Sequence, residues 1–329
     1  MIISVVQLGT LDYATGLRLQ QRLVELRKNN EIANVLLLLE HTPVITLGRN
    51  ARRNNVLASD ELLKQRGVEL FECDRGGDVT YHGPGQLVGY PIFDLRSFLG
   101  PDGQRKTLGA VDYVRRLEEA LVRTCADFGI PTERVAGMTG VWTQLSTAVI
   151  TSGANEQNKP LRPVIPSGAN ERNNPLRPVI PSGANERSNS LSPVIPSGAN
   201  ERSERAQSRD PYPTHESQAK IAAIGVHISR GVTSHGFALN VNTDLENFNL
   251  IVPCGISTRP VTSLQRALGR AIALDDVAQS VARNFGRVFN SQIVWVDSLD
   301  ALLGRSVDVP ARAPQELRKM AGEEDTFWV

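Results

Sequence analysis

A tandem repeat in the middle of the chain sets the strongest constraint on how these 329 residues can fold. Four units of 15 residues begin at Val149, Val164, Val179 and Val194, and the second unit reads VIPSGANERNNPLRP. Each unit carries only two or three large apolar residues, so burying them would not offset the entropy lost on ordering the unit. A repeat solenoid is the alternative, but solenoid units run to roughly 20–50 residues and present an apolar face. We therefore expect residues 149–218 to be a disordered insertion.

The rest of the chain alternates strand-like and helix-like segments, a pattern typical of one α/β domain. The predicted strands are residues 2–8, 34–40, 44–47, 68–73, 87–93, 140–143, 221–228 and 236–241, and the predicted helices are 13–28, 109–128, 263–268 and 274–285. Residues 1–148 and 219–297 would form a single domain, and residues 298–329 a C-terminal extension. The insertion would join two adjacent strands, where length is tolerated because closure entropy grows only logarithmically.

Composition narrows the possible partners and cofactors. Charged residues make up 22% of the chain and the net charge is +1, so no basic surplus points to nucleic acid or to an anionic membrane. The chain shows neither a long apolar run nor a signal-peptide pattern at its start, and we expect a cytoplasmic protein. Three cysteines without a CxxC pair, and histidines without ligand spacing, predict neither a disulfide framework nor a metal site.

The densest cluster of chemically active residue types is the block RGGDVTYHGPGQ at residues 75–86. Its four glycines allow positive φ angles and close approach of the backbone to a ligand. We interpret the block as a loop that lines a pocket, with Arg75 and His82 as polar groups, although a tight structural turn is the alternative. No GK[ST] follows the glycines, so the block is not a phosphate-binding loop of the Walker type.

Cys254 and Lys220 are the candidate reactive pair. Cys254 follows a proline and precedes a glycine in the string PCGI, whereas Cys73 and Cys125 fall in apolar strand and helix patterns and are predicted to be core. Lys220 begins the predicted strand KIAAIGVHI. A desolvated ammonium beside Cys254 would favour the thiolate and form a nucleophile and base pair. Taken singly, a buried structural thiol and a solvated lysine at a strand end are the alternatives.

Six ordered strings together resemble the lipoyl(octanoyl) transferases of lipoate biosynthesis. They are RGGDVTYHGPGQLVGYPI at 75–92, GVW at 140–142, KIAAIGV at 220–226, HGFALNV at 235–241, PCGI at 253–256 and TSL at 262–264. The resemblance implies an α/β (α+β) fold with a mixed sheet and flanking helices, similar to the catalytic domains of biotin and lipoate ligases. This chain differs from the family at the insertion, because the family usually joins the GVW and KIAAIG strands by a short loop.

The same resemblance implies the roles of individual residues. Cys254 would carry the acyl thioester, and Lys220 would activate Cys254. The substrate-contacting segments of the family fall on Arg75, Gly76, Gly77, Asp78, Val79, Thr80, Tyr81 and His82, on Ala223, Ile224 and Gly225, and on Gly236, Phe237 and Ala238. His82 would orient the acyl carbonyl or the reactive pair. For His235, a role at the pocket rim and a structural role remain equally open.

The reaction implied by the resemblance is ping-pong acyl transfer without a cofactor. The donor would be octanoyl-acyl carrier protein, and the acceptor a lysine on a lipoyl domain of 2-oxo acid dehydrogenase complexes or on the glycine cleavage carrier protein. Two alternatives stay open: an ATP-dependent lipoate or biotin protein ligase on the same fold, and a non-catalytic protein that binds the acyl carrier.

Overall fold

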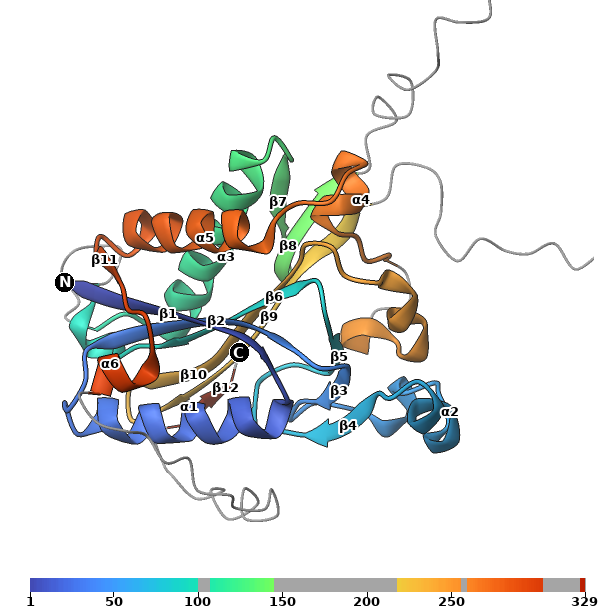
Figure 1. Cartoon of the computed structure of the whole chain (residues 1–329), viewed down its shortest axis with the longest axis horizontal. Helices are drawn as coiled ribbons and strands as arrows, with labels where there is room; N and C mark the ends of the chain where they lie inside the picture. Colours follow the sequence, from blue (N-terminus) through green and yellow to red (C-terminus); the bar gives the residue numbers. More distant parts are fainter. Residues whose placement is uncertain (100–106, 145–217, 256–258, 304–325, 329) are drawn as a thin grey trace, which may run out of the picture. The chain divides into compact units, whose positions relative to one another are not determined.

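The computed structural model describes residues 1–99, 107–144, 218–255, 259–303 and 326–328 (Figure 1). Except for residue 218, the predicted insertion at 149–218 lies outside these ranges, as does most of the predicted extension at 298–329. The described part of the extension includes helix α6 (Leu299–Leu303), whose leucines pack against the hydrophobic core, and strand β12 (Thr326–Trp328), which pairs with the main sheet.

The main sheet is mixed, as predicted, and its strands follow the order β11, β1, β2, β6, β10, β9, β8, β7, with β12 attached to β9. β1 pairs in parallel with β2 and β11, and the other pairs are antiparallel. The bounds are β1 (Ile2–Leu11), β2 (Asn34–His41), β6 (Gln86–Ile92), β7 (Thr132–Val135), β8 (Met138–Gln144), β9 (Gln218–Ser229), β10 (Val232–Asn240) and β11 (Gln292–Trp295).

Helices cover both faces of this sheet (Figure 1). α1 (Tyr13–Lys28) lies on one face, and α3 (Ala110–Asp127) and α5 (Leu274–Val288) lie on the other, with α4 (Leu264–Leu268) near them. The apolar run in β2 follows from this arrangement, because Leu36 and Leu38 pack on the α3 and α5 side while Leu37 and Leu39 pack on the α1 side. Alternate residues of a strand point to opposite faces, so a strand covered on both sides is apolar throughout.

A second sheet of three strands, in the order β4, β3, β5, lies beside the main one. Its strands are β3 (Val44–Leu47), β4 (Glu69–Glu72) and β5 (Val79–His82). They pack with α2 (Asp60–Gln65), η4 (Leu245–Leu250) and the residues that follow η1 (Arg53–Asn55). Part of the block interpreted as a loop is therefore strand β5. Its β-branched and aromatic residues favour a strand, and all four of them are buried.

The strands on either side of the predicted insertion are neighbours. β8 and β9 pair antiparallel, and the pairing reaches Gln144 opposite Gln218, the residues next to the gap in the described chain. The prediction that the insertion joins two adjacent strands is confirmed. A short turn would be long enough to connect them.

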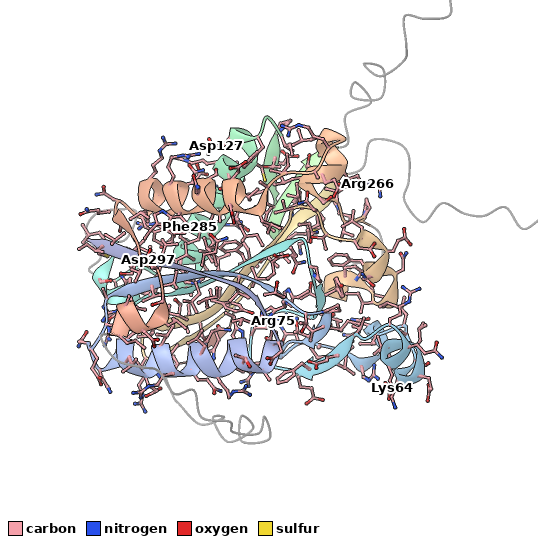
Figure 2. The ribbon with its side chains drawn as sticks, in the orientation of Figure 1. Lys64, Arg75, Asp127, Arg266, Phe285 and Asp297 are labelled. Carbon is pink, nitrogen blue, oxygen red and sulfur yellow. The ribbon has the colours of Figure 1, made fainter. Side chains whose placement is uncertain are left out.

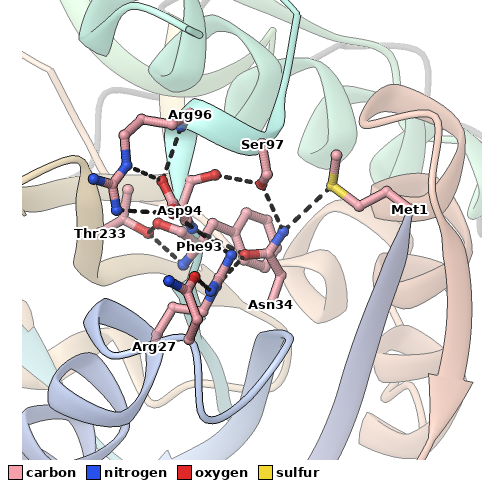
Figure 3. A network of polar contacts seen from close by, with 9 residues as sticks. Met1, Arg27, Asn34, Phe93, Asp94, Arg96, Ser97 and Thr233 are labelled. Carbon is pink, nitrogen blue, oxygen red and sulfur yellow. Dashed lines mark hydrogen bonds and ion pairs between the residues drawn. The ribbon is translucent and has the colours of Figure 1, made fainter.

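A polar network fixes the ends of β2 and β6 that lie farthest from β5 (Figure 3). Asp94 accepts two hydrogen bonds from the guanidinium of Arg96, both at 2.9 Å, and its carboxylate lies 3.6 Å from the Arg27 guanidinium. Asn34 accepts from Arg27 Nε at 3.0 Å and donates to Ser97 Oγ at 3.2 Å. The buried carboxylate at this end therefore has two cationic partners.

Within the described residues, no helix combines the length and apolarity needed to span a bilayer. Nor does this part of the chain gather three histidine, cysteine or acidic side chains in a way that would hold a metal ion.

Candidate active site

A cavity of about 210 Å³ opens where β5, β6, β9 and β10 approach the start of α1. Its lining includes most of the residues for which the sequence predicts substrate contact: Arg75, Gly77, Asp78, Thr80, His82, Ala223, Ile224, Gly225, Gly236, Phe237 and Ala238. Lys220 lines the same cavity. Segments separated by more than a hundred residues thus meet around one space.

Three residues of the predicted set do not line the cavity. Val79 and Tyr81 point away from it into the core of the second sheet, because they alternate with Thr80 and His82 along β5. Gly76 instead supports the wall, since its N–H donates to the Val226 carbonyl at 3.0 Å.

Arg75 is buried inside the molecule, in contrast to Lys64 on the outer helix α2 (Figure 2). Its guanidinium donates to the Thr46 carbonyl at 2.8 Å, to the Thr46 hydroxyl at 2.8 and 3.2 Å, and to the Gly76 carbonyl at 3.0 Å. All of these acceptors are neutral. Among the residues that the structure describes, no carboxylate pairs with Arg75, so its positive charge is available to the cavity.

Lys220 is buried in β9, with 8% of its surface exposed, which excludes the alternative of a solvated lysine at a strand end. Trp142 lies opposite it on β8, and the ammonium sits 5.1 Å from the centre of the Trp142 ring, within the range of a cation–π interaction. Gly140 also approaches Lys220 closely, because a Cβ at this position would lie 2.7 Å from Lys220 Cε. Its φ of 120° is a further reason for glycine. The GVW string therefore shapes the site of Lys220.

Cys254 lies in the turn η5 (Pro253–Gly255), whose backbone is described although the Cys254 side chain is not. Pro253 and Lys220 border the same narrow gap beside the cavity. Gly255 permits the turn with a φ of 68°, and a Cβ there would lie 2.5 Å from Asp78 Oδ2. The turn is thus held next to Asp78, and it places residue 254 close to the wall that contains Lys220.

The other two cysteines are packed away from this turn. Cys125 is fully buried in α3, and burial raises the pKa of its thiol to about 12. Cys73 is partly buried against the small cluster that contains Tyr13. The prediction that both belong to the core is confirmed for Cys125, and Cys73 lies at the edge of the core.

Two histidines bond to the same aspartate, Asp74, at the cavity. His235 lines it and also bonds to Asp74 Oδ1 at 2.7 Å, while His227 bonds to Asp74 Oδ2 at 2.7 Å. Burial alone would raise the pKa of Asp74, but the hydrogen bonds and charges of the two histidines outweigh it and hold that pKa well below its usual range. His235 therefore combines the two roles that the sequence left open.

Comparison with known proteins identifies the family. Residues 12–286 match the model of the lipoyl protein ligase A/B catalytic domain. The chain belongs to this family. It is 48% identical over 319 residues to an octanoyltransferase of Koribacter versatilis, covering 97% of each chain. It is 50% identical over 305 residues to an octanoyltransferase of Acidobacterium capsulatum, covering 92% of this chain and 96% of that protein. The prediction of an acyltransferase is confirmed by these relatives.

Solved structures of lipoate ligases show the same fold. The bi-partite lipoate protein ligase of Thermoplasma acidophilum superposes with a TM-score of 0.55 at 12% identity, covering 92% of this chain and 90% of that one. Lipoate-protein ligase A bound with ATP gives a TM-score of 0.55 at 12% identity, covering 92% of both chains. At this identity the likeness establishes the ligase-like fold alone, and it confirms the predicted fold class.

The cavity residues that were not predicted from the sequence include Tyr13, Val88, Tyr90, Met138 and Thr139. Val88 and Tyr90 lie inside the quoted string LVGYPI, where their alternation along β6 was a usable signal. The other three had none, because their positions depend on how distant elements pack.

Proposed function

We propose that this protein transfers an octanoyl group from octanoyl-acyl carrier protein to the target lysine of lipoyl domains, through a thioester on Cys254. The reaction would serve lipoate biosynthesis in the cytoplasm, with lipoyl domains of 2-oxo acid dehydrogenase complexes and the glycine cleavage carrier protein as acceptors. The proposal is carried by one observation: the turn that contains Cys254 and the buried Lys220 border the same gap beside the cavity. The octanoyltransferase relatives support the substrate.

In the first half-reaction, the Cys254 thiolate attacks the carbonyl carbon of the donor thioester. A nearby ammonium favours the thiolate, and Lys220 supplies this charge. The new C–S bond forms as the old one breaks, and the carrier thiolate leaves with the electron pair and takes a proton from Lys220. The products are the acyl-enzyme and the free carrier thiol.

In the second half-reaction, the neutral amine of the acceptor lysine attacks the acyl-enzyme. The C–N bond forms, the C–S bond breaks, and the sulfur leaves as thiolate. Lys220, left neutral by the first half, accepts the proton that the amine loses. Exchange of one thioester for another is nearly balanced and conversion to an amide is downhill, so the cycle needs no ATP.

The cavity supports an alkyl substrate because part of its wall is apolar, including Val88, Ile224 and Phe237. Each buried methylene contributes about 0.8 kcal/mol, so a C8 chain gains roughly 5 kcal/mol. A change of two methylenes would alter binding by roughly tenfold. The depth of the cavity would then determine chain-length preference.

The test is intact mass after mixing with octanoyl-acyl carrier protein. We expect one octanoyl adduct on the wild type, removable by hydroxylamine, and none on Cys254→Ala. Cys73→Ala and Cys125→Ala are the controls and should still label. Labelling of Cys254→Ala would reject the nucleophile, and transfer of free octanoate only with ATP would favour the ligase alternative. A folded wild type that binds the carrier without labelling would indicate the non-catalytic alternative.

A further inference from the structure

A chain of buried hydrogen bonds runs from the backbone near Lys220 to the ring of His82. Asn240 Nδ2 donates to the Thr262 carbonyl at 2.9 Å, and Asn240 Oδ1 accepts from Gln86 Nε2 at 2.9 Å. Gln86 Nε2 also donates to the Tyr81 carbonyl at 3.1 Å, and Gln86 Oε1 lies 2.6 Å from His82 Nδ1. The Thr262 N–H in turn donates to the Lys220 carbonyl at 2.9 Å.

The donors and acceptors in this chain of hydrogen bonds can be assigned in only one way. Backbone carbonyls can only accept, so the Thr262 carbonyl fixes the Asn240 amide and the Tyr81 carbonyl fixes the Gln86 amide. Gln86 therefore presents its oxygen to His82, and His82 Nδ1 must be the donor. A neutral imidazole with its proton on Nδ1 has a lone pair on Nε2.

The surroundings keep this ring neutral. Burial lowers the pKa of His82 to about 3, and the neighbouring His41 contributes in the same direction. Tyr13 stacks on the ring with 6.2 Å between centroids, and the His41 ring lies 5.9 Å away. Arg75 and His235 are the other charged or titratable groups that act on it, and both oppose protonation. Within the described chain no group bonds His82 Nε2, and the residue lines the cavity.

The second histidine is fixed in the same way. His41 Nδ1 lies 3.0 Å from the Leu11 carbonyl and must donate to it, so its Nε2 accepts from the Tyr90 hydroxyl at 2.6 Å. Burial lowers the pKa of His41 to about 4, which keeps this ring neutral as well. The proton of Tyr90 is thus directed away from the cavity that Tyr90 lines. This part of the wall offers acceptors, in contrast to the donors on Arg75 and Lys220.

We propose that His82 Nε2 accepts a hydrogen bond from the amine that attacks the acyl-enzyme, and that Gln86 is the positioning residue that fixes the required tautomer. The inference rests on the proposed function. An acyl chain and its thioester carry no hydrogen-bond donor, whereas a neutral primary amine has two N–H groups and one lone pair. A hydrogen bond to Nε2 leaves that lone pair free to attack, while Lys220 still receives the proton that the amine loses. A ring that resists protonation can accept this hydrogen bond without taking up the proton itself.

The first test needs no turnover. Long-range proton–nitrogen NMR spectra of the wild type, labelled with ¹⁵N-histidine, should show His82 with a protonated Nδ1 and an unprotonated Nε2, unchanged from roughly pH 5 to 8. Gln86→Met, which is similar in size and forms no such hydrogen bond, should show a mixture of tautomers. A wild-type His82 with its proton on Nε2 would overturn the inference and leave the proposed function untouched.

The second test separates the two half-reactions. His82→Phe should slow amide formation from isolated acyl-enzyme by about 100-fold, with less than a tenfold effect on acyl-enzyme formation. His82→Gln places an amide oxygen near the former Nε2 and should recover transfer to within about tenfold of wild type. Equal loss in both variants, or a larger effect on the first half, would overturn the inference. Absence of any acyl-enzyme in the wild type would instead overturn the proposed function.

Discussion

β6 runs past two buried charged residues, and the protein treats the two charges differently. Near the last residue of β6, the Asp94 carboxylate has Arg96 and Arg27 as partners, and Asn34 and Ser97 complete the network (Figure 3). Earlier along the strand, Val88 and Tyr90 line the cavity, where the Arg75 guanidinium is bonded, within the described chain, only to neutral oxygens. We call this region the cavity end and the Asp94 region the opposite end. One end satisfies its charge within the protein, and the other keeps charge available.

The difference distinguishes structural from functional use of buried polar groups. A buried charge is costly unless it is paired and hydrogen-bonded, so the Asp94 network removes a cost that the fold would otherwise bear. At the cavity end part of that cost remains, because the Arg75 cation is buried and the rings of His41 and His82 are held neutral. Perturbed groups of this kind gather where a protein binds or reacts with a substrate. Substitutions at the two ends should therefore affect different properties.

Lys220→Ala tests the cavity end and should have the largest effect. We expect octanoyl transfer to fall by about 1000-fold, because both the proton carrier and the charge that favours the Cys254 thiolate are lost. The unfolding free energy should change by no more than about 1 kcal/mol. The measurements are single-turnover transfer, denaturant unfolding and reaction with iodoacetamide at neutral pH. Lys64→Ala on α2 is the control, and iodoacetamide reactivity equal to wild type in Lys220→Ala would show that Lys220 does not activate Cys254.

Asp94→Ala tests the opposite end. It should lower the unfolding free energy by about 3 kcal/mol, because the buried Arg27 keeps its charge without a carboxylate partner. Transfer measured well below the unfolding temperature should stay within a few-fold of wild type. Asp60→Ala is the matched control, since it removes an exposed ion pair with Arg53 and should change stability by less than about 1 kcal/mol. If Asp94→Ala abolished transfer without loss of stability, the division between the two ends would be wrong.

This division also explains what the sequence could predict. Local patterns predicted helix 13–28, which matches α1, and every predicted strand overlaps an observed one. Cys254, Lys220 and the glycine-rich block were found because each stands out within a short string. The pairing of Gln86 with Asn240 was not found, since it joins residues 154 positions apart and each is unremarkable in its own segment. Contacts of this range depend on strand order, which no local pattern encodes.

Acid should weaken the two ends in different pH ranges. Burial holds the pKa of His82 at about 3, below its unfolded value of about 6.5, so the unfolded chain binds more protons between these values. Stability is therefore full above about pH 6.5 and falls as the pH drops, by about 2 kcal/mol for this ring down to pH 5. Asp94 differs: burial would raise its pKa, but Arg96 and Arg27 lower it below 3.8, so its contribution is lost only below that pH.

Denaturant titrations across this range measure both effects. His82→Gln should reduce the loss of stability between about pH 6.5 and 5, and the lowered pKa of His41 should account for part of the loss that remains. Asp94→Asn should leave that part of the profile unchanged. A wild-type stability that is constant down to pH 5 would show that His82 is not held neutral by burial. The same result would weaken the inference drawn for its Nε2.

The smallest effect should come from replacing residues 149–216 by a short Gly/Ser turn. Described residues outside the repeat line the cavity, and β8 and β9 already pair up to Gln144 and Gln218, so a turn suffices to connect them. Loop closure entropy changes only slowly with length, so the thermal midpoint should stay the same or rise by a few degrees, and transfer should remain within a few-fold of wild type. From the composition of the repeat we also expect limited proteolysis to cut first at its arginines and to leave two associated, active fragments. A folded deletion variant that cannot transfer octanoate would show that the repeat contributes to the cavity end, and that this end depends on groups beyond the residues described above.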